Sequence, residues 1–202
     1  MSGWGRALGA SARIWVPVAV GVTAAQTLLV LGDPVPLASP AFVALTLGSG
    51  AAFAIGLWLV SRALLLAVDG EPVRWRAVLL SHSALLWAIV VVVLLVLLAL
   101  LSPYLTVVGL WFGLLVMPAA AAGASNALSG AWATVRRRPA RVILGALLVA
   151  VIWAVGAVGM LLLGFFVTGP LSVALTWLAL TVVGTVLLAA WTGLYRRALP
   201  TA

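Results

Sequence analysis

The sequence predicts an all-α fold: a polytopic bundle of six transmembrane helices, arranged as three hairpins, that forms a single domain over residues 1–202. Composition is the first observation behind this prediction, because 66% of residues are hydrophobic and 7% are charged, whereas about 25% are charged in soluble domains. The mean hydropathy of +1.33 is also far above the soluble range. The second observation is spacing, because apolar stretches of the roughly 20 residues needed to cross a bilayer alternate with short connections.

The first hairpin is expected to pair spans 14–31 and 41–60. The turn between them contains Pro34 and Pro36, and proline stops a helix because it lacks the backbone N–H. The second helix has an apolar continuation as far as Val68. Arginines precede the first span, as in a signal peptide, but the apolar run continues to about Leu31 with no clear small-x-small cleavage site before the proline-rich turn. We therefore expect this segment to remain as a span.

The second hairpin is expected to pair spans 77–101 and 104–122, and the third to pair spans 142–167 and 171–193. A proline-containing turn separates the members of each pair, and such short turns force antiparallel packing. A basic segment that contains tryptophan precedes each hairpin. Two interpretations of the segments before the last two hairpins stay open: amphipathic helices in the membrane interface, or ordinary loops with helix ends.

The distribution of arginine predicts the orientation. The chain has 11 arginines and no lysine, and each arginine lies before the first span, between the second and third, between the fourth and fifth, or after the sixth. Short loops rich in arginine resist translocation and mark the cytoplasmic face. We therefore expect both termini inside. Arginine without lysine, with abundant alanine, valine and glycine, is typical of a GC-rich bacterial genome, so the expected location is a bacterial cytoplasmic membrane.

Six arginines are expected to contact anionic lipid head groups or a partner protein at the inner face: Arg74, Arg76, Arg136, Arg137, Arg138 and Arg141. They lie in short clusters at helix ends, where basic residues set topology and attract anionic lipid. This placement accounts for the net charge of +8 without nucleic acid, and no nucleic-acid partner is expected.

Small residues recur at four-residue spacing on two predicted spans: Gly48, Ala52 and Gly56 on the second, and Gly109 and Gly113 on the fourth. Such faces let helix backbones approach closely and gain dispersion contacts that lipid tails do not replace. We expect these faces to pack within the bundle. The alternative is packing between two copies of the chain, which would give a homo-oligomer.

Few residues are available for chemistry. The chain has no cysteine, one histidine (His82) and three acidic residues, all three outside the predicted spans, whereas proton relays inside membranes need ionisable groups at membrane depth. Ser49 and His82 differ in predicted depth by about 9 Å, while a nucleophile and its base must approach within about 3 Å. We therefore expect no catalytic, cofactor-binding or metal-binding residue and no enzymatic activity.

Uncharged polar residues in the first two spans form one candidate cavity: Gln26, Thr23, Thr46 and Ser49. A transporter is expected to gather polar residues near the membrane midplane, often at broken helices, and four residues are a small set for that purpose. The alternative for Gln26 is a hydrogen bond to a neighbouring helix, which contributes about 0.6 kcal/mol within a membrane.

Three short motifs carry a resemblance to a known family: Ala127-Leu128, Trp132 and Arg136-Arg137-Arg138 before the last hairpin, Tyr195-Arg196-Arg197-Ala198-Leu199 after it, and Gly70-Glu71-Pro72 before the middle hairpin. This layout resembles a group of bacterial six-span proteins that includes YciC-like proteins and the membrane region attached to some glycerophosphodiester phosphodiesterases. Because no phosphodiesterase domain accompanies the motifs, the resemblance transfers no catalytic residue. It implies a membrane-embedded, non-enzymatic module.

We therefore expect a non-enzymatic integral membrane protein, an accessory or structural module that associates with lipid or with another membrane protein. The alternative is a small transport component, such as the substrate-binding or permease subunit of an ABC or energy-coupling transporter, because six spans in 202 residues fit that size. A closed bundle with apolar packing favours the first interpretation. A midplane cavity lined by polar residues favours the second.

Overall fold

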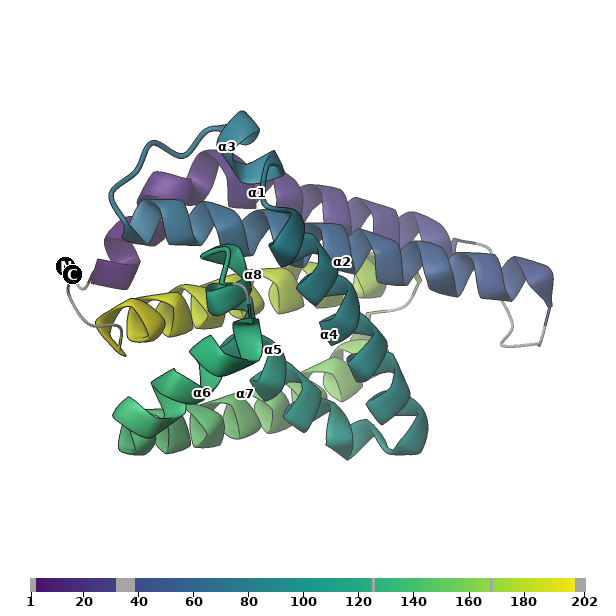
Figure 1. Ribbon diagram of the computed structural model, residues 1–202. Helices are drawn as coiled ribbons and strands as arrows, with labels where there is room; N and C mark the ends of the chain where they lie inside the picture. The colour runs from purple at the N-terminus through teal and green to yellow at the C-terminus, as the bar shows by residue number, and fades with distance from the viewer. Residues whose placement is uncertain (1–2, 32–38, 125, 168, 199–202) are drawn as a thin grey trace.

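A computed structural model describes residues 3–31, 39–124, 126–167 and 169–198 as a bundle of helices (Figure 1). The elements in chain order are α1 (Gly3–Val30), α2 (Pro40–Val68), α3 (Trp75–Leu79), α4 (His82–Leu101), the 3-10 helix η1 (Pro103–Leu105), α5 (Thr106–Ala121), α6 (Ala127–Arg137), α7 (Pro139–Phe166) and α8 (Pro170–Ala198). These residues contain no strand, so the all-α prediction is confirmed. The predicted turn with Pro34 and Pro36 lies outside the described residues.

Five helices, α1, α2, α4, α7 and α8, are long and apolar enough to cross a membrane. The predicted span 104–122 differs, because it is divided between η1 and α5. The 16 residues of α5 cover about 24 Å, less than the roughly 30 Å of a hydrocarbon core. The predicted span 77–101 is also divided, since α3 ends at Leu79 and α4 begins at His82. Helix length thus supports five spans in the described part of the chain.

The other predicted spans correspond to helices that extend beyond their predicted ends. Helix α1 begins at Gly3 and α8 continues to Ala198, so that Arg6 and Arg196 lie within helices instead of in loops. Arginine is a good helix former, and its long stem lets the charged group reach away from the apolar surface. The basic residues therefore extend the helices into the connections.

Side-chain caps account for the start of two helices. The Ser39 hydroxyl accepts a hydrogen bond from the Phe42 N–H at 3.2 Å, and Pro40 follows at the first helical position, where its missing N–H is not needed. Asn126 Oδ1 accepts from the N–H of Leu128 at 3.0 Å and starts α6. The segment before the third hairpin is therefore a capped helix of its own.

Helix α2 is central in the bundle, because it packs against α1, α4, α5 and α8. Its second half is almost wholly buried, with Leu64 in one core cluster together with Val22 of α1, Val91 of α4 and Met117 of α5. Helices α1 and α2 lie antiparallel along their lengths and project beyond the other helices at one end (Figure 1). Helix α8 packs along α1 on another side.

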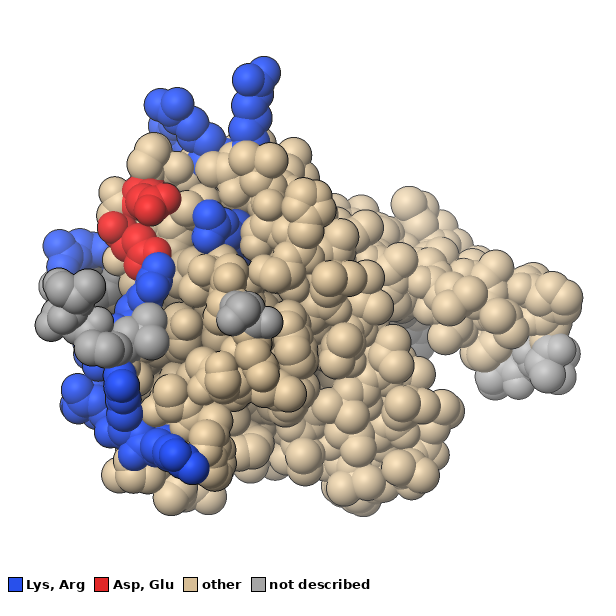
Figure 2. All heavy atoms as spheres, viewed as in Figure 1, with Lys and Arg blue, Asp and Glu red and all other residues tan. Residues whose placement is uncertain are grey.

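Charged residues gather at one end of the bundle. The starts of α1 and α7 and the ends of α2 and α8 lie at this end (Figure 1). Figure 2 shows the basic and acidic side chains on this end and on the adjoining upper side. We call this end, formed by the starts of α1 and α7 and the ends of α2 and α8, the arginine end. The helical fold thus brings together basic segments that are far apart in the sequence.

Candidate functional site

The structure joins two of the four residues predicted to line a polar cavity. Gln26 on α1 donates from Nε2 to the Ser49 carbonyl oxygen at 3.0 Å, and the Ser49 hydroxyl on α2 donates to Gln26 Oε1 at 2.7 Å. Gln26 is 2% exposed. These two hydrogen bonds join α1 to α2 and satisfy the polar groups of the Gln26 side chain, as expected for hydrogen bonds between helices in a membrane.

The other two predicted cavity residues lie elsewhere. The Thr46 hydroxyl is exposed and donates to the Phe42 carbonyl oxygen of its own helix at 2.9 Å. Thr23 lines an open groove of about 480 Å³ between α1 and α8, with Val20, Ala24 and Thr27 on one side. The groove walls are apolar apart from the two threonines, and the Thr23 hydroxyl has no hydrogen-bond partner among the described residues. The four residues therefore form no single polar cavity.

The small-residue face of α2 packs against α1. A Cβ placed on Gly56 would lie 2.7 Å from Val22 Cγ2, and one on Gly48 would lie 3.6 Å from Leu29 Cδ2. Ala52 lies between the two glycines on the same helix and is half-buried. This face is occupied by a helix of the same chain, which is the geometry that small residues permit.

The small-residue face of α5 packs in the same way against α4. A Cβ on Gly109 would lie 2.8 Å from Leu95 Cδ2, and one on Gly113 would lie 2.8 Å from Val91 Cγ1. Both glycines are buried. The close approach of α4 and α5 therefore depends on the absence of a side chain at these two positions.

The six arginines predicted at the inner face are all exposed and lie just before α3, on α3, on α6, between α6 and α7, and on α7: Arg74, Arg76, Arg136, Arg137, Arg138 and Arg141. The Arg136 guanidinium lies 5.2 Å from the centre of the Trp132 ring, a distance at which a cation–π attraction operates. Arg137 Nη1 donates to the Ala198 carbonyl oxygen at 2.7 Å and thereby ties α6 to the end of α8.

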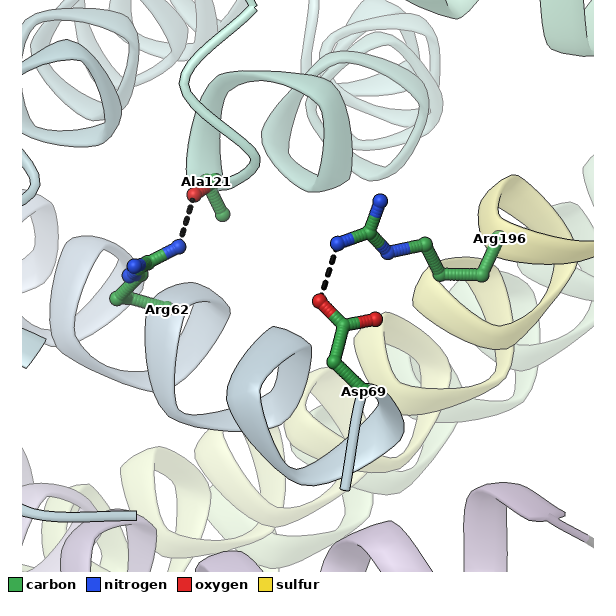
Figure 3. A network of polar contacts seen from close by, with 4 residues as sticks. All are labelled: Arg62, Asp69, Ala121 and Arg196. Atoms are coloured by element: carbon green, nitrogen blue, oxygen red, sulfur yellow. Dashed lines mark hydrogen bonds and ion pairs between the residues drawn. The ribbon is translucent and has the colours of Figure 1, made fainter. Parts of the chain in front are cut away.

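A second group of arginines, which the sequence analysis did not single out, surrounds the end of α5 (Figure 3). Arg62 Nη1 on α2 donates to the Ala121 carbonyl oxygen at 2.8 Å, and the Ser83 hydroxyl on α4 donates to the Ala120 carbonyl oxygen at 2.8 Å. Both alanines are completely buried. A buried helix end needs such donors for its free carbonyls, and the positive guanidinium also complements the negative end of the helix dipole.

Arg196 reaches the same region from α8 (Figure 3). Its Nη2 pairs with Asp69 Oδ2 at the end of α2. This is the one ion pair between side chains in the part of the chain that the structure describes. The signal in the sequence was the position of Arg62, which falls inside the continuous helix that ends at Val68 and not in a loop. The expected continuation of this helix to Val68 is confirmed, and the packing of its last turns against the end of α5 is what the sequence did not reveal.

The residues considered for catalysis are not assembled into a reactive group. Ser49 donates its hydroxyl proton to Gln26, and His82 stands at the start of α4 after Ser81. Among the described residues, no three His, Cys, Asp or Glu side chains are grouped so that they would hold a metal ion.

Comparisons with models of protein families, with curated proteins and with solved structures gave no significant match. They neither support nor contradict the resemblance to the YciC-like group.

Proposed function

We propose that this chain is a non-enzymatic integral membrane protein of the bacterial cytoplasmic membrane, an accessory module that binds anionic lipid head groups through its arginine end. Both termini then lie on the cytoplasmic side. The observation that carries the proposal is the concentration of exposed arginines at one end of the bundle and on the adjoining side (Figure 2). A leaflet that contains anionic lipid attracts such residues by about 1 kcal/mol for each arginine near its surface.

The geometry of α6 supports placement in the membrane interface. Ala127, Ala131 and Thr134 are buried on one side of the helix, while Trp132 and Arg136 are exposed on the other. The exposed Trp132 and Arg136 suit the head-group level, where tryptophan is enriched and arginine is attracted to anionic lipid. This supports the interfacial alternative for the segment before the third hairpin.

The lipid proposal is tested with protein in nanodiscs that contain phosphatidylcholine with or without phosphatidylglycerol. A variant with glutamine at Arg74, Arg76, Arg136 and Arg141 is compared with a matched variant that carries lysine at the same four positions. We expect phosphatidylglycerol to raise the unfolding temperature of the natural chain and of the lysine variant, and to do so less at high salt. Equal stabilisation of the glutamine variant would contradict the proposal.

The accessory role is tested by a mild-detergent pull-down of the tagged protein from its native membrane, with mass spectrometry of proteins and lipids. Recovery with lipid alone, or with a membrane complex that is not a transporter, supports the proposal. Recovery of a stoichiometric ATPase or energy-coupling subunit would replace it with the transport-component alternative. The structural feature closest to that alternative is the groove between α1 and α8, which Thr23 lines and whose other walls are mainly apolar.

A further inference from the structure

Buried hydrogen-bond donors without acceptors gather where α2, α5 and α8 meet. Five buried side-chain polar atoms have no partner among the described residues, and three of them are Trp58 Nε1, Arg62 Nε and Arg196 Nε. All three are N–H groups, which donate and do not accept. The other two atoms, Thr23 Oγ1 on α1 and Trp111 Nε1 on α5, can also donate. Buried donors are normally paired, so unpaired donors on neighbouring helix ends indicate a missing acceptor.

The three donors belong to one place in the fold. Trp58 and Arg62 are four residues apart on α2 and so share a helix face. Trp58 packs against the cluster that includes Ala121, and Arg62 bonds to the Ala121 carbonyl oxygen. Figure 3 shows the guanidinium groups of Arg62 and Arg196 reaching from two helices toward the end of α5. Trp58 and Arg62 therefore adjoin the end of α5, and Arg196 reaches the neighbouring end of α2, where it pairs with Asp69.

Charge points to the same conclusion. Arg62 is partly buried and makes no ion pair with a carboxylate in the described part of the chain. Arg196 shares its charge with Asp69, so that the two arginines and this acid together leave one positive charge without a counter-ion. A partly buried charge is expensive to desolvate unless it is paired, and the neutral Ala121 carbonyl compensates it only in part.

We propose that Arg62 and Arg196, with the Trp58 indole, bind a phosphate group, and that this group belongs to an anionic phospholipid such as phosphatidylglycerol. A phosphate presents several acceptor oxygens to the planar arginine fork and supplies the missing negative charge. The site is at the arginine end, where the proposed function places lipid head groups, and basic sites between helices on that side bind them. The inference rests on the proposed membrane orientation, but it concerns one bound lipid and not the exposed surface.

Asp69 gives the proposal a distinctive consequence. Its carboxylate occupies Arg196 Nη2 and repels an anion. The Asp69→Asn substitution removes the negative charge while keeping the shape, and it should tighten phosphate binding. If the pair with Arg196 only stabilised the fold, the same substitution would leave lipid binding unchanged and would lower stability.

The test is native mass spectrometry of the delipidated full chain in mild detergent, titrated separately with phosphatidylglycerol, phosphatidylcholine and inorganic phosphate. We expect one phosphatidylglycerol per chain. Arg62→Gln should weaken this binding about tenfold or more, because it removes a charge-assisted contact. Arg62→Lys should weaken it less, and Asp69→Asn should strengthen it. Arg13→Gln serves as the matched control and should bind like the natural chain, because Arg13 is exposed on α1 and is not among the six arginines predicted to contact lipid.

Separate titration with the three ligands distinguishes binding of a lipid phosphate from binding of free phosphate. Binding of inorganic phosphate alone, with the same dependence on Arg62, supports the phosphate site and assigns it to a soluble anion. Equal binding of phosphatidylglycerol to the natural chain and to Arg62→Gln, or equal binding of phosphatidylcholine, would overturn the proposal. Should Arg62→Gln fail to fold, Arg62→Lys and Asp69→Asn decide alone. If phosphatidylglycerol does not raise the unfolding temperature in nanodiscs but one molecule still binds in mass spectrometry, the proposed function is wrong and the phosphate site stands.

Discussion

The contact between α1 and α2 at Gly56 makes the sharpest prediction. An alanine Cβ at this position would lie 2.7 Å from Val22 Cγ2, whereas carbon atoms pack best at about 3.5–4.0 Å. Valine is stiff and buried here, so the helices must separate by about 1 Å or a side chain must leave its rotamer, which costs about 1–3 kcal/mol. The control is Gly21→Ala, because a Cβ there meets no atom within 4 Å.

Both substitutions replace glycine by alanine inside a helix, so the gain in helix propensity of about 1 kcal/mol is common to the two. The difference between their free energies of unfolding therefore isolates the steric cost. We expect Gly56→Ala to be less stable than Gly21→Ala by about 1–3 kcal/mol in equilibrium unfolding in mixed detergent micelles. Adding Val22→Ala should remove most of this difference, since it deletes the clashing methyl group. Equal stabilities of the two alanine variants would refute the reasoning.

Three further predictions concern other contacts. Gln26→Leu should lower the free energy of unfolding by about 0.6–1.7 kcal/mol. A double-mutant cycle with Ser49→Ala should show that the two losses are coupled, and purely additive losses would contradict the hydrogen bonds between Gln26 and Ser49. Trp153→Phe removes the indole hydrogen bond to Thr106, which is 3.1 Å long, and thermal unfolding should show a loss of about 1 kcal/mol; an unchanged unfolding temperature would mean that this bond does not stabilise α7. Because the natural chain has no cysteine, Glu71→Cys supplies a single label site, and an impermeant maleimide should react with it only after the cell membrane is opened; labelling of intact cells would place this connection outside.

Much of the fold was predictable because composition and apolar periodicity act locally. The all-α class, the pairing of α1 with α2 and of α4 with α5, and the position of the basic segments follow from helix propensity and from where prolines interrupt apolar runs. Boundaries were less predictable. Apolar residues at 104–122 look like a span, yet the helix that reaches Ala121 begins only at Thr106. A composition window does not detect where a 3-10 turn replaces an α-helical one.

The candidate site was less predictable than the fold. Sequence identified Gln26 and Ser49 as unusual polar residues, but only the packing of α1 on α2 revealed that they bond to each other. It did not single out Arg62, which was counted among the arginines that follow the second span, because the contact with α5 joins two helices and leaves no local signal. The residue lies in fact within α2, beside the buried end of α5.

The sequence by itself determined that the chain is helical and apolar and that its charge is confined to a few segments, because these properties depend on residue type and local spacing. Tertiary structure alone decided which donors meet which acceptors. The Arg62 contact with Ala121 and the pairing of Asp69 with Arg196 join residues 59 and 127 positions apart. Such contacts depend on how the helices cross, and local spacing does not encode that.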